Sequence, residues 1–259
     1  MPVRSGLAGW QNACLAPKDR ASKVSGRNHM TTCLWWVRPA TFKVTPAALA
    51  LLNADERAQQ QRFIPAAKQH EYLVTRVMVR TVLGTMLGLA PASLTFSVNQ
   101  WGRPTLSPGD AASQLNFNVS HTDGLIVCLV SSAYEVGVDT ELFARAANLL
   151  ALAPRVFAPR ELSELAALPI AEQAQRAVVL WTLKESYIKA RGMGLALPLD
   201  GFSFRFEGEQ VRLEVKPALK DDGARWQFQT FLLGAHCVST AIAHPAKQPI
   251  EIKLREAFA

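Results

Sequence analysis

The sequence lacks the features that would place the chain in a membrane or hold it together with cross-links. No apolar run approaches the roughly 18–20 residues that a membrane-spanning helix needs. The four cysteines are scattered, and none belongs to a Cys-x-x-Cys pair: Cys14, Cys33, Cys128 and Cys237. This spacing argues against a zinc site and gives no disulfide pattern. We therefore expect a protein of the reducing cytoplasm, with no membrane partner.

Acidic residues are scarce in the first part of the chain. The net charge is +7, and residues 1–29 hold five basic residues and one acidic residue. Residues 30–103 hold eight basic and three acidic residues, whereas residues 104–259 hold 15 basic and 17 acidic residues. A basic first half beside a slightly acidic second half fits one multiply charged small ligand better than a nucleic acid. We expect no nucleic-acid partner.

The first 29 residues have no apolar segment of the kind that a secretory signal requires. They mix Gly, Ser, Pro and charged residues, and Met30 then begins a strand-like stretch that contains Leu34-Trp35-Trp36-Val37. We expect residues 1–29 to be a disordered extension. The alternative is a basic targeting arm.

The remaining chain has enough apolar residues for a substantial core, with 49% hydrophobic residues overall. It also contains a weak internal repeat. A helical pattern from about Ala66 to Leu87 ends at a glycine, and a second from about Glu172 to Ala190 ends near Gly192 and Gly194. Each pattern is followed by a proline, a strand-like stretch and then a hairpin pattern.

The repeat predicts an α+β protein built as a pseudo-dimer of two similar subdomains. We place the subdomains at residues 30–142 and 143–259, and expect a monomer with an internal pseudo-twofold axis. Two such units side by side would leave a cleft, which is a common place for a ligand.

Two short motifs hold the chemistry that would line such a cleft. The first is Gly137-Val138-Asp139-Thr140-Glu141, in which the spacing puts both carboxylates on one face of a strand. Taken alone, the two carboxylates are as consistent with a solvated strand end as with a functional site.

The second motif is Trp181-Thr182-Leu183-Lys184-Glu185-Ser186-Tyr187-Ile188-Lys189. Glu185 and Lys189 lie four apart, on one face of a helix, where a surface ion pair is the simpler interpretation. Trp181 and Ile188, however, place Glu185 at the border of the apolar stripe. Three carboxylates and a lysine at one point would suit Mg²⁺ holding a phosphate ester.

Two further segments are candidates for phosphate contacts. Ser120 and His121 are adjacent on a strand and point to opposite faces, so they cannot pair as nucleophile and base. We favour a phosphate contact for them, and a structural role for the histidine is the alternative. The turn Trp101-Gly102-Arg103-Pro104 presents an arginine suited to a phosphate.

With these segments together, the chain strongly resembles the Sfp-type 4′-phosphopantetheinyl transferases over roughly residues 34–244. The matching motifs are Gly102-Arg103-Pro104, Phe117-Asn118-Val119-Ser120-His121 and the two motifs that contain Asp139 and Glu185. The resemblance implies a Mg²⁺-dependent enzyme that moves the 4′-phosphopantetheine arm of coenzyme A to a serine of an apo acyl or peptidyl carrier protein. The second product would be adenosine 3′,5′-bisphosphate.

The resemblance also implies roles for individual residues. Asp139, Glu141 and Glu185 would hold Mg²⁺ against the pyrophosphate, and Lys189 would bind a pyrophosphate oxygen. His121 and Arg103 would hold the 3′-phosphate and the neighbouring adenosine, in a pocket shaped by Gly102, Pro104, Asn118 and Ser120. Glu185 is the first choice for the base that takes the serine proton, and Glu141 or a metal-bound water is the rival.

One position departs from the family pattern. Family members often carry a basic residue for the 3′-phosphate where this chain has Gln59. Arg57 and Arg62 are the candidates to replace it.

Two other functions stay open at this point. A Mg²⁺-dependent nuclease would also use acids and a lysine, although the basic excess is confined to the first half of the chain. A catalytically inactive relative that only binds carrier proteins is the other alternative. The sequence does not identify the carrier protein or its pathway.

Overall fold

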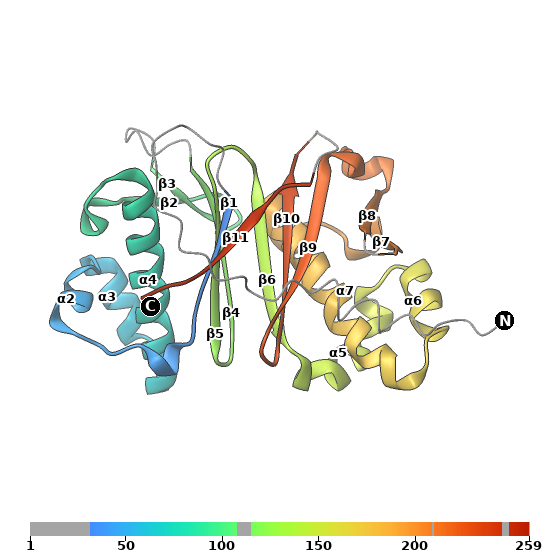
Figure 1. Cartoon of the computed structure of the whole chain (residues 1–259), viewed down its shortest axis with the longest axis horizontal. Coiled ribbons are helices and arrows are strands. Elements are labelled where there is room, and N and C mark those ends of the chain that lie inside the picture. Colours follow the sequence, from blue (N-terminus) through green and yellow to red (C-terminus); the bar gives the residue numbers. More distant parts are fainter. Residues whose placement is uncertain (1–31, 108–114, 209, 245–248, 259) are drawn as a thin grey trace.

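The computed structural model describes residues 32–107, 115–208, 210–244 and 249–258 (Figure 1). The prediction for residues 1–29 lies outside these ranges. The helices and strands in chain order are β1 (Thr32–Val37), α2 (Pro46–Ala50), α3 (Ala54–Gln61), α4 (Ala66–Leu87), β2 (Phe96–Val98), β3 (Pro104–Leu106), β4 (Asn116–Thr122), β5 (Leu125–Ser131), β6 (Val136–Leu142), α5 (Ala146–Val156), α6 (Pro159–Ala166), α7 (Ile170–Arg191), β7 (Phe202–Glu207), β8 (Gln210–Val215), β9 (Trp226–Leu233), β10 (His236–Ala243) and β11 (Ile252–Glu256).

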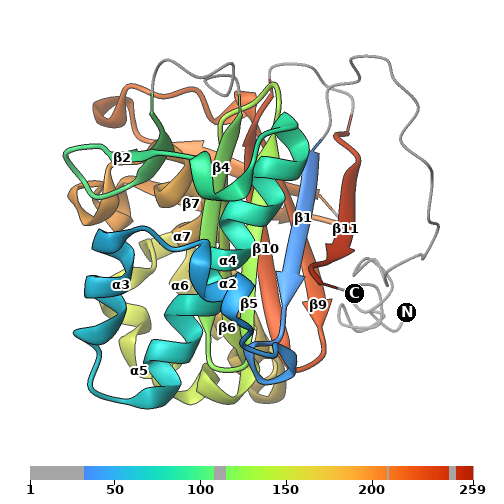
Figure 2. The same cartoon turned by 90° about the vertical axis from the view of Figure 1, so that its left-hand side faces the viewer.

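Two sheets form the centre of the molecule, and the two long helices cover their outer faces (Figure 1). The first sheet has the order β11-β1-β5-β4, in which only the β1–β11 pair is parallel. The second sheet has the order β6-β10-β9 and is antiparallel. Figure 2 shows α2, α3 and α4 on the side of the first sheet that faces away from the second. Two small hairpins, β2–β3 and β7–β8, complete the fold.

Strand β5 shows why the sheets stack in this way. All seven of its residues are buried. Ile126, Cys128 and Val130 pack with α4, and the alternate residues Leu125, Val127 and Leu129 pack with the second sheet. Because neighbouring residues of a strand point to opposite faces, one continuous apolar run can serve both layers. The layers are therefore helix, sheet, sheet and helix.

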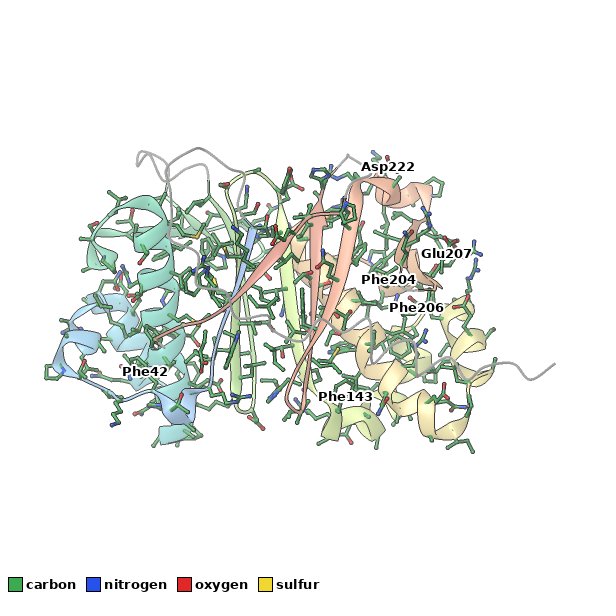
Figure 3. The ribbon with its side chains drawn as sticks, viewed as in Figure 1. Phe42, Phe143, Phe204, Phe206, Glu207 and Asp222 are labelled. Atoms are coloured by element: carbon green, nitrogen blue, oxygen red, sulfur yellow. The ribbon has the colours of Figure 1, made fainter. Side chains whose placement is uncertain are left out.

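The pseudo-dimer predicted from the repeat is confirmed. Helices α4 and α7 each contain 22 residues, begin after a proline and end at a glycine in the left-handed region, with φ of 67° at Gly88 and 63° at Gly192. A hairpin follows each helix, and a second hairpin, β4–β5 or β9–β10, then enters a central sheet. Aromatic side chains take part in the packing around α7: Tyr187 lies edge-on to Trp226. Phe204 of β7, which Figure 3 labels, lies edge-on to Phe228.

The two halves exchange strands at their ends. Strand β6 pairs with β10 of the second sheet, and β11 pairs with β1 of the first. The subdomain boundary at residue 142 stays a prediction. No helix in the described part of the chain is both long and apolar enough to cross a membrane.

Candidate active site

The candidate site lies where β4 of the first sheet meets β6 of the second. Figure 1 shows these strands beside one another at the centre of the molecule. Side chains at three alternate positions of β4 join the two strands: Asn118 Oδ1 accepts from Val138 N at 2.9 Å, Ser120 Oγ donates to Asp139 Oδ1 at 2.8 Å, and Thr122 Oγ1 donates to Glu141 Oε1 at 3.0 Å. The junction between the halves therefore holds the carboxylates in place.

Gly137 determines how closely α7 approaches β6. A Cβ atom at this position would overlap the carbonyl oxygen of Ser186 and would lie 2.5 Å from the backbone nitrogen of Ala190. Such contacts are far inside van der Waals distance, so only glycine allows this approach. The close approach brings Glu185 and Lys189 of α7 to the side of β6 that carries Asp139.

Asp139 and Lys189 form the central ion pair. Lys189 Nζ lies 2.5 Å from Asp139 Oδ1 and also donates to Ser120 Oγ at 2.9 Å. Burial raises the pKa of Asp139 above its ordinary value, and the Lys189 charge and the Ser120 hydroxyl oppose that rise. A nearby cation stabilises the charged form of such a buried carboxylate, and Lys189 supplies that cation here.

The other two acids are held differently. Glu141 Oε1 accepts from the backbone nitrogen of Leu142 at 2.8 Å, and Glu141 Oε2 lies 3.5 Å from Arg145.

Glu185 is half-buried and has no hydrogen-bond or ion-pair partner in the described part of the chain. Burial raises the pKa of Glu185, the charge of Asp139 raises it further, and Lys189 opposes the rise. A carboxylate with a raised pKa and a free oxygen is suited to take up a proton.

These groups open into one cavity of about 270 Å³, here named the acidic pocket. Its lining residues are Lys68, Ser120, His121, Thr122, Asp123, Asp139, Thr140, Glu141, Arg145, Trp181, Glu185 and Lys189. The two acids of β6 lie within the strand and are both buried, so a solvated strand end is the wrong interpretation of them. Helix α7 likewise directs Glu185 and Lys189 into this pocket.

The acids suit Mg²⁺ by their chemistry, because it prefers oxygen ligands and takes one or two carboxylates alongside phosphate oxygens. Glu185 and Oδ2 of Asp139 have no donor among the described residues. No three His, Cys, Asp or Glu side chains of these residues are already gathered closely enough to form a metal site. The donor set fits the ion by its chemistry, although the three acids are not gathered at one point in the described structure.

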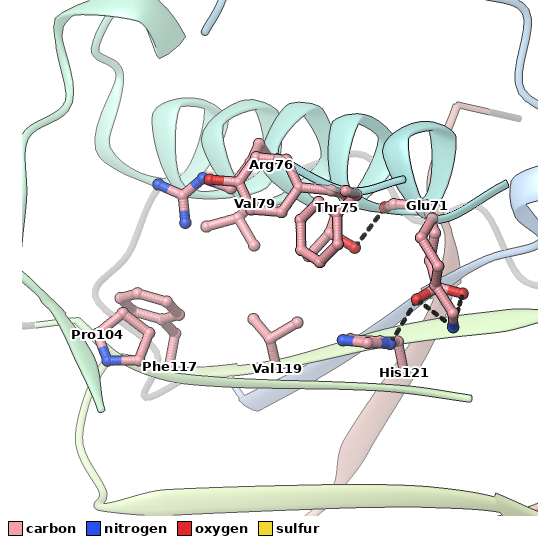
Figure 4. Close-up of a pocket in the computed structure, with 11 residues that line it drawn as sticks. Glu71, Thr75, Arg76, Val79, Pro104, Phe117, Val119 and His121 are labelled. Atoms are coloured by element: carbon pink, nitrogen blue, oxygen red, sulfur yellow. Dashed lines mark hydrogen bonds and ion pairs between the residues drawn. The ribbon is translucent and has the colours of Figure 1, made fainter. Parts of the chain in front are cut away.

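A second cavity, of about 500 Å³, adjoins the first between α4 and β4 and is here named the α4–β4 pocket (Figure 4). Its lining residues are Phe63, Lys68, Glu71, Tyr72, Thr75, Arg76, Val79, Pro104, Phe117, Val119 and His121. Lys68 and His121 line both pockets. The His121 ring points across the pocket to Glu71, with 2.8 Å between Nδ1 and Oε1 (Figure 4).

The turn that contains Gly102 and Arg103 lies elsewhere. Neither residue lines either pocket, whereas Pro104 lines the α4–β4 pocket. The Arg103 guanidinium donates to the carbonyl oxygens of Ala190 at 2.5 Å and Val136 at 3.0 Å. Arg103 thus joins the β2–β3 hairpin to the end of α7 and to β6, and its contact with a 3′-phosphate stays a prediction.

Several lining residues were not candidates from the sequence. Lys68 and Glu71 lie three apart on α4, a spacing that predicts a surface ion pair as readily as a site. Arg145 follows the β6 motif by four residues, with no pattern of its own. Their place in a cavity becomes visible only when the strand and the helix that face them are known.

Comparison with known proteins identifies the family of this chain. A model of the 4′-phosphopantetheinyl transferase superfamily matches residues 135–241, and a model of the N-terminal region of 4′-phosphopantetheinyl transferase matches residues 35–133. The two matches together cover both halves of the fold and every motif described above.

Individual relatives give the same result. A 4′-phosphopantetheinyl transferase of Bacillus subtilis is 34% identical over 72% of this chain and 75% of its own length. The 4′-phosphopantetheinyl transferase Sfp of Bacillus subtilis strain 168 is 31% identical over 69% of this chain and 77% of its own length. A solved structure of a holo-(acyl-carrier-protein) synthase from Bacillus anthracis shows 16% identity over 44% of this chain and 100% of its own, with a TM-score of 0.38. By its similarity to the first two relatives, the chain belongs to the Sfp-type 4′-phosphopantetheinyl transferases and is a transferase.

Proposed function

We propose that this protein transfers the 4′-phosphopantetheine arm of coenzyme A to a serine of an apo carrier protein in a Mg²⁺-dependent reaction. The observation that carries this proposal is the convergence of Asp139, Glu141, Glu185 and Lys189 on one pocket. These are the groups that a reaction at a pyrophosphate requires, namely oxygen ligands for a metal, a cation for phosphate charge and a candidate base.

Coenzyme A would span the two adjoining pockets. Its pyrophosphate would lie in the acidic pocket, beside Lys189, and its nucleotide end in the α4–β4 pocket. The second pocket suits a planar base because Tyr72, Phe117 and Val119 supply apolar lining. Lys68 and His121 lie at the border of the two pockets, where the ligand would pass from one to the other.

Asp139, Glu141 and Glu185 would hold the metal ion, which when bound neutralises charge on the pyrophosphate oxygens. Lys189 is anchored by Asp139 and Ser120 at the edge of the same pocket. From that position, its ammonium group would donate to a pyrophosphate oxygen and stabilise the charge that develops on it. Arg145 is a second cation at the rim, 57% exposed.

The transfer step breaks one phosphorus–oxygen bond and forms another. The serine oxygen of the carrier forms a bond to the phosphorus that bears the pantetheine arm, and the bond from that phosphorus to the bridging oxygen breaks. Adenosine 3′,5′-bisphosphate leaves with that oxygen. Glu185 takes the serine proton, because its carboxylate has a raised pKa and no competing donor among the described residues.

The partners follow from this reaction and are coenzyme A and an apo acyl or peptidyl carrier protein. We propose that the enzyme acts as a monomer, since both halves of the site come from one chain. The scattered cysteines lead us to propose that it works in the reducing cytoplasm. Because the chain belongs to a family of transferases, no observation favours the alternative that it is a nuclease.

Mass spectrometry of several apo carrier proteins tests the proposal. Each carrier is incubated with the enzyme, coenzyme A and Mg²⁺, and we expect a mass gain of one phosphopantetheine arm on at least one of them. The carrier that reacts fastest identifies the class of partner. A carrier that binds without any mass gain would instead indicate a catalytically inactive relative.

A further inference from the structure

Glu71 places a carboxylate inside the α4–β4 pocket, against two of its basic side chains. Glu71 Oε1 lies 3.1 Å from Lys68 Nζ and 2.8 Å from Nδ1 of His121 (Figure 4). Lys68 Nζ also donates to the second oxygen, Oε2, at 3.1 Å. The Glu71 side chain is only 12% exposed, so it is a fixed part of the pocket wall.

The third basic side chain of the pocket is also paired. Arg76 Nε donates to Glu56 Oε1 at 2.6 Å, and the other oxygen of Glu56 accepts from Arg80 at 3.0 Å. Lys68 has a further acidic neighbour in Asp123, at 3.7 Å. Among the described residues that line the pocket, every basic side chain therefore has a carboxylate partner.

The position that departs from the family pattern adds no charge. Gln59 is neutral, and its side-chain oxygen accepts from Arg62 at 3.3 Å. Arg57 donates to the carbonyl oxygen of Leu52 at 3.0 Å. Neither arginine lines the pocket, so neither compensates there for the missing basic residue.

We infer that Glu71 determines donor specificity, because its carboxylate pairs with the basic side chains that a 3′-phosphate would need. The enzyme then uses donors without a 3′-phosphate nearly as well as coenzyme A. This inference rests on the proposed function. It names the substrate class as pantetheine diphosphate esters, with or without a phosphate on the ribose.

The physical reason is an exchange of one anion for another. A ribose 3′-phosphate carries a charge of about −1.5 to −2 near neutral pH. If it displaces the Glu71 carboxylate in order to bond to Lys68 and His121, the bonds that it gains only replace the bonds that are lost. If Glu71 stays in place, the two anions repel each other at short range. In both cases the 3′-phosphate adds little net affinity.

The test compares coenzyme A with 3′-dephospho-coenzyme A as donors. Transfer to one carrier protein is measured for the wild type, for Glu71→Gln and for Glu71→Lys. We expect the wild-type kcat/KM values for the two donors to agree within about threefold, and both variants to prefer coenzyme A by about tenfold or more, the size of one charge-assisted contact. Glu251→Gln is the matched control, because Glu251 is exposed and lines neither pocket.

A binding measurement makes the inference independent of transfer. Calorimetry with adenosine 3′,5′-bisphosphate and with adenosine 5′-monophosphate reports the 3′-phosphate contact alone. We expect similar affinities in the wild type and a gain for the bisphosphate in Glu71→Gln. A wild type that already prefers coenzyme A and the bisphosphate by more than about tenfold, with no change in Glu71→Gln, overturns the inference. A lack of transfer from both donors overturns the proposed function instead, and the nucleotide comparison still decides the role of Glu71.

Discussion

Gly137 of β6 lies directly against the backbone of Ser186 in α7, with no room for a side chain between them. This contact fixes the distance between the strand that bears Asp139 and the helix that bears Lys189. Gly137→Ala should therefore push the helix away and cost about 1–3 kcal/mol of stability, as overpacking in cores does. Turnover should fall more than this loss explains, because the ion pair at the site is stretched.

Urea unfolding and steady-state transfer below the unfolding transition separate the two effects for Gly137→Ala. A variant with wild-type stability and wild-type turnover would show that α7 can adjust and that the close contact does not set the site.

Asp139 is expected to be essential for the reaction and dispensable for the fold. Asp139→Ala removes a proposed metal ligand and leaves Lys189 without its 2.5 Å partner. We expect transfer to fall by about 100-fold or more. The far-ultraviolet circular dichroism spectrum should match that of the wild type, since burial already raises the pKa of this acid and disfavours its charged form. Near-wild-type turnover of Asp139→Ala at ordinary Mg²⁺ concentrations is the result that contradicts the metal assignment.

Glu185 is expected to act on the proton of the serine. Glu185→Gln keeps the shape of the side chain but cannot accept a proton, so kcat should fall by about 100-fold or more. The KM for coenzyme A should change little if the remaining acids still hold the metal. The control is Glu251→Gln, which removes the same charge outside both pockets. Unchanged kcat with a raised KM would assign the base role to Glu141 or to water.

Asp221 gives the protein a pH-dependent part of its stability. Burial alone would raise its pKa, but hydrogen bonds from Tyr187 and Trp226 and the Arg191 charge outweigh burial and hold the pKa below its ordinary value. A lowered carboxylate pKa stabilises the fold above the unfolded-state pKa of about 4, and that stability is lost as the pH falls through the lower folded-state value.

Asp221→Asn should consequently lose about 1.5–3 kcal/mol near neutral pH, the range for hydrogen bonds to a charged group. The difference from the wild type should shrink as the pH drops below about 4. Urea unfolding of both proteins at neutral and acidic pH measures this. A difference that is the same at both pH values would show that the charge of Asp221 contributes nothing.

The sequence predicts the repeated helices and the paired acids, because local patterns determine both. The range predicted for α4 agrees with the structure, and α7 extends only slightly beyond its predicted range at each end. The contacts within the site could not be predicted in the same way. Asp139 and Lys189 are 50 residues apart, and Arg103 bonds to a carbonyl 87 residues away. Such pairs depend on how the two halves pack, which no local pattern encodes.

The most direct test of the proposed transfer counts both products of one reaction. The enzyme, an apo carrier protein and coenzyme A are incubated with Mg²⁺ or with a chelator in its place. Holo carrier protein is quantified by mass spectrometry, and released adenosine 3′,5′-bisphosphate is quantified by chromatography. We predict equal amounts of the two products with Mg²⁺ and almost none with the chelator. Equal transfer in the presence of the chelator would contradict the proposed Mg²⁺ dependence, and nucleotide release without a modified carrier would contradict the proposed transfer.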